Sequence, residues 1–238
     1  MTAAAAHDQA TAARLVAAAT ELFAERGFAN VTVRDICERA QANVAAINDH
    51  FRGKDGLYHE VLQSAIRIMR ETTDLARAAG RDKTADEQLR VYVRTFITRV
   101  VASRGNWIHQ LMTRELSDPT PALDLVIAEV IQPRLAYLGG IVAKVMGVDD
   151  TDPRVLPCVF SVNAQCVTLL NHKGATRVDP RFVLTPDAVE TMVQHVATFS
   201  LAGIRAMVAS PVPPASRRPP RQARRRGGGG RRRVRSRG

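Results

Sequence analysis

VTVRDICERAQANVAAINDHF, residues 31–51, is the stretch of this chain that decides its fold. Thr32 is placed to cap a short helix, and Asp35 three residues later would complete a capping box. Val31 before the cap and Ile36 inside the helix would form a hydrophobic staple. After a tight turn, Asn43 is placed to cap a second short helix. The stretch therefore predicts two short helices joined by a turn.

Helices this short bury little apolar surface without a partner. Ile36 and Ala40 would face inward from the first helix, and Ile47 and Phe51 would do so from the second. Both helices must then pack on a third helix and leave their outward faces available for function. This arrangement is the helix-turn-helix, whose second helix enters a DNA major groove. The sequence predicts a DNA-binding protein.

The rest of the chain has helical periodicity, and no segment alternates as a strand would. Gly27 would end the first helix, with Phe28 folding back on Phe23. We predict an all-α fold with an N-terminal three-helix helix-turn-helix DNA-binding domain and a C-terminal helical ligand-binding and dimerisation domain. The further helices are expected from Lys54 to Ala79, from Asp86 onward, over Trp107–Leu116, from Thr120–Pro121 to Met146 with a bend at Pro133, over Val155–Leu170 and over Pro186–Val208.

The predicted boundaries are 10–56 for the DNA-binding domain, 57–210 for the effector-binding and dimerisation domain, and 211–238 for a tail. The tail is rich in arginine and glycine and has few apolar residues, so we expect it to be disordered.

The net charge of +11 comes from this tail. Of the 34 Lys and Arg residues, 11 are arginines of segment 216–238, which leaves 23 basic against 23 acidic residues. The basic composition is therefore no support for the helix-turn-helix interpretation. One hypothesis is that the tail supplies electrostatic attraction to phosphates, which would steepen the salt dependence of DNA binding. The alternative is that the tail is dispensable.

Composition also limits the cellular setting. No apolar run approaches the roughly 20 residues of a membrane span, and the N-terminus lacks the pattern of a secretory signal. The three cysteines, Cys37, Cys158 and Cys166, are an odd number without metal-ligand spacing, which favours reduced thiols. We expect a cytoplasmic protein with no membrane partner.

The last helix carries more apolar surface than one buried face needs. Its apolar positions cover well over half of the circumference, which predicts a homodimer formed by the last two helices of each subunit. The alternative is burial of this helix within its own subunit. These positions, with one serine among them, are Val189, Met192, Val193, Val196, Phe199, Ser200, Ile204 and Val208.

The segments RLVAAATELFAERGFANVTVRDICERA and NVAAINDHFRGKDGLYHEVL strongly resemble the DNA-binding domain of TetR-family transcriptional regulators over roughly residues 11–62. The later pattern TRELSDPTPALD resembles the C-terminal domain of one branch of that family. The resemblance implies an all-α homodimer that binds a palindromic operator in double-stranded DNA. Such a protein is most often a repressor that a small-molecule effector releases from DNA.

The resemblance also implies which residues contact DNA. Thr32 and Arg34 would face the phosphate backbone, and His50 and Lys54 would reach phosphate, the latter from a helix N-terminus. The candidates for the groove are Asn43, Val44, Ala45, Asn48 and Asp49. An asparagine can pair with adenine, and small apolar side chains can pack on a thymine methyl.

Each assignment has an alternative: Asn43 only caps its helix, His50 only packs on the turn, and Lys54 is only a solvated charge. Two positions depart from the family pattern. Gln41 stands where glycine is usual, which costs about 1–2 kcal/mol if the backbone is left-handed there. Asp49 stands where an aromatic residue is usual, so it either accepts from a cytosine amino group or weakens backbone binding.

A ligand sensor needs a cavity among the helices between residues 86 and 175. Apolar walls with a few polar groups are typical of such sites. The candidate lining residues are Tyr92, Phe96, Trp107, His109, Met112, Gln165 and Cys166. We expect Arg114 and Glu115 to pair locally or to cap a neighbouring helix rather than to hold a ligand.

Other function classes have less support. The sequence lacks GxSxG, the GxxxxGK[ST] loop and paired Cys-x-x-Cys motifs, so we predict no catalytic residues and no enzyme. The six histidines have no metal-binding spacing, and no cofactor or metal is expected. The remaining alternative is a non-specific nucleic-acid-binding protein driven by the arginine-rich tail. Whether a regulator of this kind represses or activates is left open.

Overall fold

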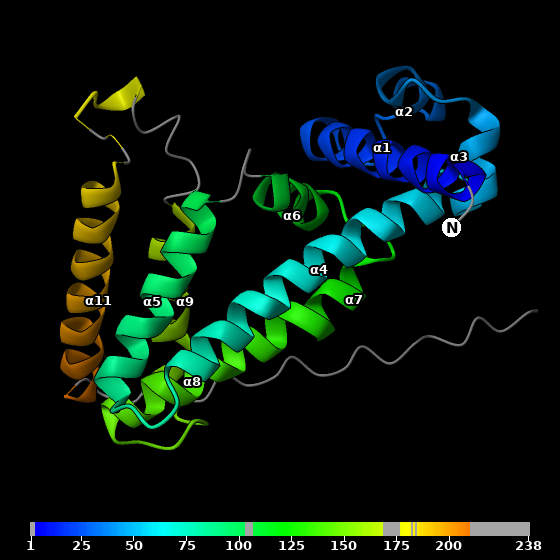
Figure 1. The fold of residues 1–238 in the computed structure, drawn as a ribbon. Helices are drawn as coiled ribbons and strands as arrows, with labels where there is room; N and C mark the ends of the chain where they lie inside the picture. Colours follow the sequence, from blue (N-terminus) through cyan, green and yellow to red (C-terminus); the bar gives the residue numbers. More distant parts are fainter. Residues whose placement is uncertain (1–2, 103–106, 169–176, 182, 184, 210–238) are drawn as a thin grey trace, which may run out of the picture.

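The computed structural model describes residues 3–102, 107–168, 177–181, 183 and 185–209, and its regular elements there are all helical (Figure 1). The predicted tail and the expected end of one helix at Leu170 lie outside the described residues. The helices are α1 (Ala3–Arg26), α2 (Val33–Ala40), α3 (Val44–Phe51), α4 (Lys54–Ala79), α5 (Ala85–Ala102), α6 (Trp107–Ser117), α7 (Leu123–Val126), the π-helical turn η2 (Ile127–Ile131), α8 (Gln132–Met146), α9 (Val155–Thr168) and α11 (Pro186–Val208).

The local signals at the N-terminus are confirmed. The Thr32 hydroxyl accepts a hydrogen bond from the Asp35 amide, and the Asp35 carboxylate accepts from the Thr32 amide, which completes the capping box of α2. The Asn43 side chain caps α3 by accepting from the Ala46 amide at 2.8 Å. Gly27, with φ of +80°, ends α1.

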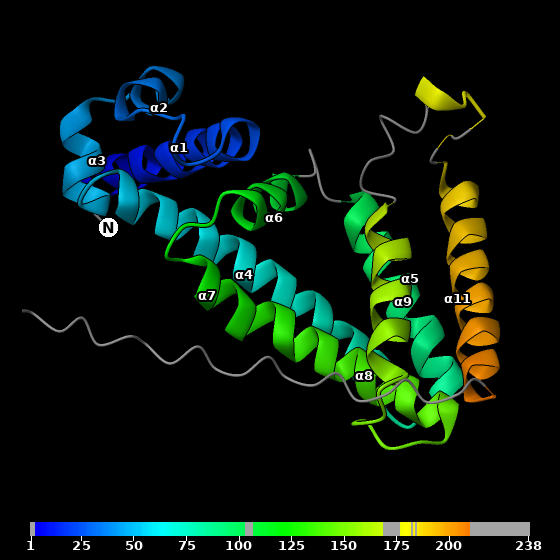
Figure 2. The same cartoon turned by 180° about the vertical axis from the view of Figure 1, so that it is seen from behind.

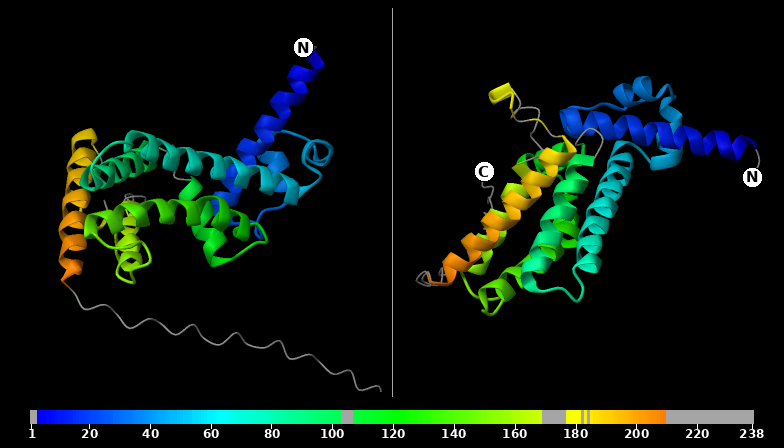
Figure 3. Two further views of the ribbon diagram at one scale, coloured as in Figure 1. Left: turned by 90° about the horizontal axis from the view of Figure 1, so that it is seen from below. Right: turned by 60° about the vertical axis from the view of Figure 1, so that its left-hand side comes forward.

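The helices form two groups joined by α4 (Figure 1, Figure 2). At one end α2 and α3 lie against α1, and at the other end α5, α8, α9 and α11 pack together. The long helix α4 runs from the first group to the second beside α7, η2 and α8 (Figure 3). Helix α6 packs against α1 close to where α4 leaves the N-terminal helices.

Two hydrophobic cores correspond to these groups. The N-terminal core is built around Phe23, Ile36, Ile47 and the first half of α4, and it also takes in Leu111 of α6. The second core unites buried residues of α5, α8, α9 and α11. The N-terminal helices are thus fixed to α6 by shared apolar burial, which links the two parts of the chain.

The helix expected from Thr120–Pro121 to Met146 differs from the prediction in two ways. Regular helix begins only at Leu123, because the Thr120 hydroxyl bonds the Glu115 carboxylate and the next two residues form a turn. The run is also not continuous α-helix, since residues 127–131 form a π-helical turn that ends two residues before Pro133. Proline has no amide hydrogen to complete the ladder, so a change of hydrogen-bond register is expected there.

By length and composition alone, the helical run 123–146 of the described residues could cross a membrane. Core helices of soluble proteins pass the same test, and this run supplies Val130 and Leu138 to the two cores. This helix was expected from its periodicity, but charged residues such as Glu129 and Arg134 interrupt its apolar residues, so an overall hydropathy as high as that of a membrane span was not expected.

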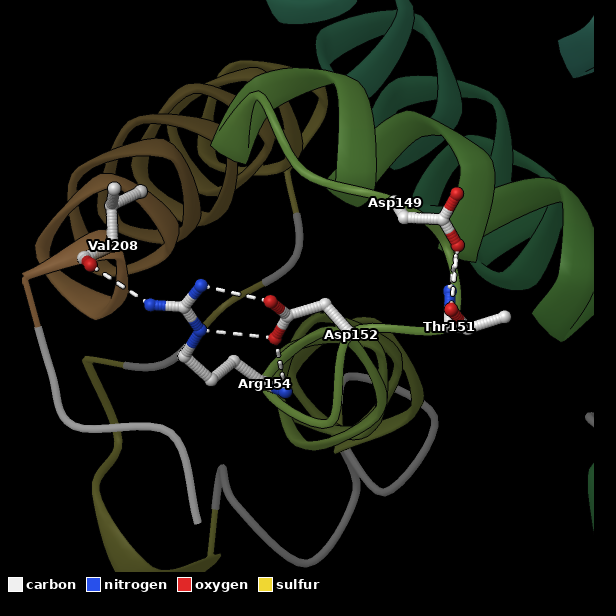
Figure 4. A network of polar contacts seen from close by, with 5 residues as sticks. All are labelled: Asp149, Thr151, Asp152, Arg154 and Val208. Atoms are coloured by element: carbon white, nitrogen blue, oxygen red, sulfur yellow. Dashed lines mark hydrogen bonds and ion pairs between the residues drawn. The ribbon is translucent and has the colours of Figure 1, made fainter. Parts of the chain in front are cut away.

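A polar network fastens the end of α11 to the loop between α8 and α9 (Figure 4). Arg154 forms a two-point ion pair with Asp152, at 3.0 Å and 2.8 Å, and donates to the Val208 carbonyl at 2.9 Å. These hydrogen bonds hold the pKa of Asp152 at about 2. The network fixes the last turn of α11 against the C-terminal core.

Candidate nucleic-acid interface and ligand cavity

The outward face of α3 is the candidate surface for DNA. Ile47 is fully buried and holds the helix against the N-terminal core, whereas the residues predicted to enter the groove are exposed. These exposed residues are Asn43, Val44, Ala45, Asn48 and Asp49. Half of the surface of Val44 is accessible, although it is a large apolar side chain. The exposed side of α3 therefore carries both polar and small apolar side chains, and both kinds can contact base edges in a DNA groove.

The turn between α2 and α3 has the strained backbone that its sequence suggested. Gln41 has φ of 51° and ψ of 49°, the left-handed region, and its amide donates to the Glu38 carbonyl at 3.4 Å. Glutamine adopts this conformation at a cost of about 1–2 kcal/mol relative to ordinary helical geometry. The left-handed Gln41 therefore closes the turn at a cost in stability.

The two residues at the start of α2 that are predicted to face phosphate are exposed, but both already have a hydrogen-bond or ion-pair partner. The Thr32 hydroxyl also donates to the Asp35 carboxylate at 2.6 Å, and these hydrogen bonds lower the pKa of Asp35. Arg34 is largely solvent-accessible and pairs with Glu38 at 2.9 Å on its own helix. Exposed ion pairs of this kind contribute little to stability, so Arg34 can exchange partners at low cost.

His50 and Lys54 are held in place by protein contacts. His50 is half-buried, and its Nε2 lies 3.2 Å from a carboxylate oxygen of Asp8 on α1. The Lys54 ammonium lies 4.2 Å from the centroid of the Phe28 ring, a cation–π contact. Neither side chain is simply a solvated charge, and each lies beside a terminus of α3 or α4.

A cavity of about 550 Å³ lies among α4, α5, α6, α8 and α9. Three of the predicted lining residues, Phe96, His109 and Met112, do line it. Burial lowers the pKa of His109, which favours its neutral form. The remaining lining residues were not predicted from the sequence, and these are Ile68, Met69, Thr72, Arg99, Ile108, Thr113, Leu116, Ile131, Arg134, Leu135, Phe160, Asn163 and Val167.

The other four predicted cavity residues lie elsewhere. Tyr92 and Cys166 are buried in the C-terminal core, where burial raises the pKa of the Cys166 thiol to about 12. Trp107 packs against the N-terminal core. Gln165 is exposed, and its amide donates to the Ser200 hydroxyl at 3.3 Å, which ties α9 to α11. Helical periodicity predicts which residues are buried. It does not show whether a buried residue lines a cavity or packs within the core.

Helix α6 lies between the cavity and the N-terminal helices. Arg114 donates from Nε to the Ala24 carbonyl at 3.0 Å and from Nη2 to the Glu25 carbonyl, so it caps the end of α1. Glu115 is 1% exposed and accepts from the Tyr58 hydroxyl of α4 and from the Thr120 amide at 2.9 Å. The prediction that these two residues make local or capping contacts is confirmed, and their contacts bridge α6 to α1 and α4.

Comparison with known proteins decides the family. Residues 15–61 match the family described as bacterial regulatory proteins of the tetR family, and residues 85–204 match the C-terminal domain of the HTH-type transcriptional dual regulator CecR. The chain belongs to the TetR family. It is a DNA-binding transcriptional regulator with a CecR-like C-terminal domain, as the helix-turn-helix and the TRELSDPTPALD pattern indicated.

Individual TetR-family relatives agree with this assignment. The chain is 31% identical to the HTH-type transcriptional dual regulator CecR of Shigella flexneri over 152 residues, which cover 60% of this chain and 68% of the relative. It is 47% identical to an HTH-type transcriptional repressor of Mycobacterium tuberculosis over 51 residues, which cover 21% and 27%.

Solved structures of bacterial regulators share the architecture. A TetR-family transcriptional regulator from Streptomyces coelicolor aligns with a TM-score of 0.59 and 25% identity, over 83% of this chain and 97% of that one. The fatty acid degradation regulator FadR from Bacillus halodurans aligns with a TM-score of 0.59 at 17% identity, over 82% and 96%, which shows the fold alone. The family is soluble and non-enzymatic, so the predictions of an all-α regulator and of no enzyme are confirmed.

Proposed function

We propose that this protein is a cytoplasmic homodimeric repressor that binds a palindromic operator and is released when a small molecule enters the cavity beside α6. Segment 10–56 is the DNA-binding domain in this proposal, and 57–210 binds the effector and dimerises. The observation that carries it is the position of α6: one helix both lines the cavity and fastens α1 and α4.

On the DNA side, the proposal assigns base contacts to the exposed face of α3. The residues that face the major groove are Asn43, Val44, Ala45, Asn48 and Asp49. Thr32, Arg34, His50 and Lys54 contact phosphates. The exposure of the α3 residues supports these roles, since their side chains make no contribution to the N-terminal core.

Apolar side chains exposed on α9 and α11 support the dimer. Leu156 of α9 and Phe199 of α11 are both more than half exposed. Each of these residues would leave water if the α9 and α11 faces of two subunits met. Two copies of α3 would then read the two halves of a palindrome, as two-fold symmetric helix-turn-helix proteins do.

The route from cavity to DNA follows from α6. His109 and Thr113 line the cavity and also a second hollow of about 580 Å³ between α6 and the end of α1. A ligand that displaces α6 must therefore disturb the Arg114 and Glu115 contacts that hold α1 and α4. Because α1 and α4 carry α3, the spacing of the two recognition helices changes and the operator is released.

Selection of bound duplexes from a random pool tests this proposal, followed by mapping of the protein's genomic binding sites. A palindromic consensus protected by a dimer supports it. Sequence-independent binding that disappears when residues 211–238 are deleted would instead favour a non-specific nucleic-acid-binding protein.

A further inference from the structure

The cavity has a marked electrostatic character that the family assignment does not specify. Two arginines, Arg99 and Arg134, line it together with apolar side chains, and no acidic side chain is among its described lining residues. His109, the other titratable group there, has its pKa lowered by burial and is neutral near pH 7. Among the described lining residues, the formal charges on this wall are therefore all positive.

Arg134 is the more informative of the two arginines. Its Nη2 donates to the Met69 carbonyl at 3.1 Å and its Nε to the Thr73 hydroxyl at 3.4 Å. The guanidinium also lies over the Phe96 ring, 4.5 Å from the centroid. These contacts fix the plane of the group between α4 and α5. None of the described carboxylates forms an ion pair with it.

Arg134 is half-buried, and its carbonyl, hydroxyl and ring contacts offset only part of the cost of removing the cation from water. Burial lowers the pKa of Arg134, the direction expected when apolar surroundings penalise the cation. Proteins usually place a carboxylate beside such a cation, because unpaired buried charges are costly. A guanidinium has five N–H donors in a planar fork, and its backbone and hydroxyl contacts leave donors for a planar anion.

We propose that this cavity binds an organic acid with a single carboxylate on an apolar body, and that the carboxylate pairs with Arg134. The apolar body lies among Met69, Met112 and Phe160, with Phe96 below the guanidinium. A single negative charge fits better than several, because most of the remaining wall is apolar. The inference deepens the proposed function by naming the chemical class of the effector, and it is tested by binding without DNA.

The experiment compares acids with their neutral isosteres on the full chain. Decanoate and decanamide form one probe pair, and 1-naphthaleneacetate and 1-naphthaleneacetamide form another. Calorimetric titration and thermal stabilisation at pH 7.5 report binding. We expect each acid to bind at least tenfold more tightly than its amide. Equal affinities within the pairs, or no stabilisation by either acid at millimolar concentration, overturn the proposal.

Substitutions then locate the charge that matters. Arg134→Met keeps the length of the side chain and removes the cation, so it abolishes the preference for acids while the amides still bind. Arg134→Lys keeps the positive charge but lacks the planar pair of N–H donors, so it retains part of the preference for acids. This variant replaces Arg134→Met in the test if the methionine variant does not fold. The matched control is Arg70→Met on α4, whose arginine pairs with Glu129 at 3.2 Å and does not line the cavity. An acid preference that survives in folded Arg134→Met overturns the proposal.

DNA release separates this inference from the proposed function. Acids that bind through Arg134 and release the selected operator support both. Acids that bind through Arg134 but leave the operator bound support the ligand class and contradict the effector-released repressor. Release by a neutral compound, with no binding of the acids, leaves the repressor intact and overturns the ligand class.

Discussion

The contact between Tyr58 and Glu115 is the most direct link between α4 and α6, and Tyr58→Phe removes it without changing packing. Tyr58 is 5% exposed, and its ring lies 4.9 Å from Phe23 and 4.7 Å from Phe28, centroid to centroid. Phenylalanine keeps these ring contacts. Burial, together with the Glu115 carboxylate, raises the pKa of Tyr58, so the hydroxyl remains a donor at every ordinary pH.

The size of the effect depends on the hydrogen bonds that Glu115 retains in the Tyr58→Phe variant. Its Oε1 still accepts from the Thr120 amide at 2.9 Å and from the Thr120 hydroxyl at 2.6 Å, whereas its Oε2 loses the Tyr58 hydroxyl. A hydrogen bond to a buried charged group contributes about 1.5–3 kcal/mol. We expect Tyr58→Phe to lower the free energy of unfolding by about 2 kcal/mol. At roughly 2–4 °C per kcal/mol for a chain of this size, the melting temperature falls by about 4–8 °C.

Urea and thermal unfolding followed by circular dichroism measure this change. Tyr92→Phe is the matched control, because the Tyr92 hydroxyl is buried without a hydrogen-bond partner among the described residues. Removing that hydroxyl should leave stability unchanged or raise it by up to about 1 kcal/mol, since an unsatisfied buried donor is destabilising. Equal destabilisation by the two substitutions would refute the account of the Glu115 contact.

Three further predictions concern other parts of the chain. Phe199→Glu places a charge on the exposed apolar face of α11 and should convert the dimer to a monomer in light scattering; an unchanged mass would place the interface elsewhere. The Asp152–Arg154 pair holds the pKa of Asp152 at about 2, below the roughly 3.9 of an unfolded aspartate, so it stabilises the fold above pH 4 and loses this effect as pH falls towards 2. The difference in unfolding free energy between wild type and Asp152→Asn, measured in urea, should therefore shrink between pH 5 and pH 3. A difference that stays constant over this range contradicts the prediction. Gln41→Gly relieves a left-handed glutamine and should raise the free energy of unfolding by about 1 kcal/mol, which a lower urea midpoint would disprove.

The sequence was sufficient wherever neighbouring residues determine the structure. Thr32 and Asp35 define their own cap, Gly27 supplies the positive φ that ends α1, and the helix from Lys54 to Ala79 has the predicted bounds. The exposed face of α3 could also be predicted, because a helix with one buried apolar stripe must expose the opposite side.

Features that depend on distant residues were not accessible from sequence. Arg114 caps a helix that ends about 90 positions earlier, and periodicity carries no information about such a partner. Arg134 lies on a helical run where an arginine is ordinarily solvated, so nothing in the sequence indicated that it lines the cavity. Pro133 predicts that the helix is disturbed near it. The sequence does not show that the disturbance is a π-helical turn.

The central claim is that the exposed face of α3 contacts base pairs. Ala45→Glu tests it most directly, since Ala45 is exposed and the new carboxylate would lie against base edges and phosphates without disturbing the core. Ala136→Glu on α8 makes the same change at an exposed position away from α3 and is the control. In fluorescence anisotropy with the selected operator, Ala45→Glu should weaken binding at least tenfold, which corresponds to about 1.4 kcal/mol or more, while Ala136→Glu binds as wild type does. Unchanged affinity of a folded Ala45→Glu variant would contradict the claim.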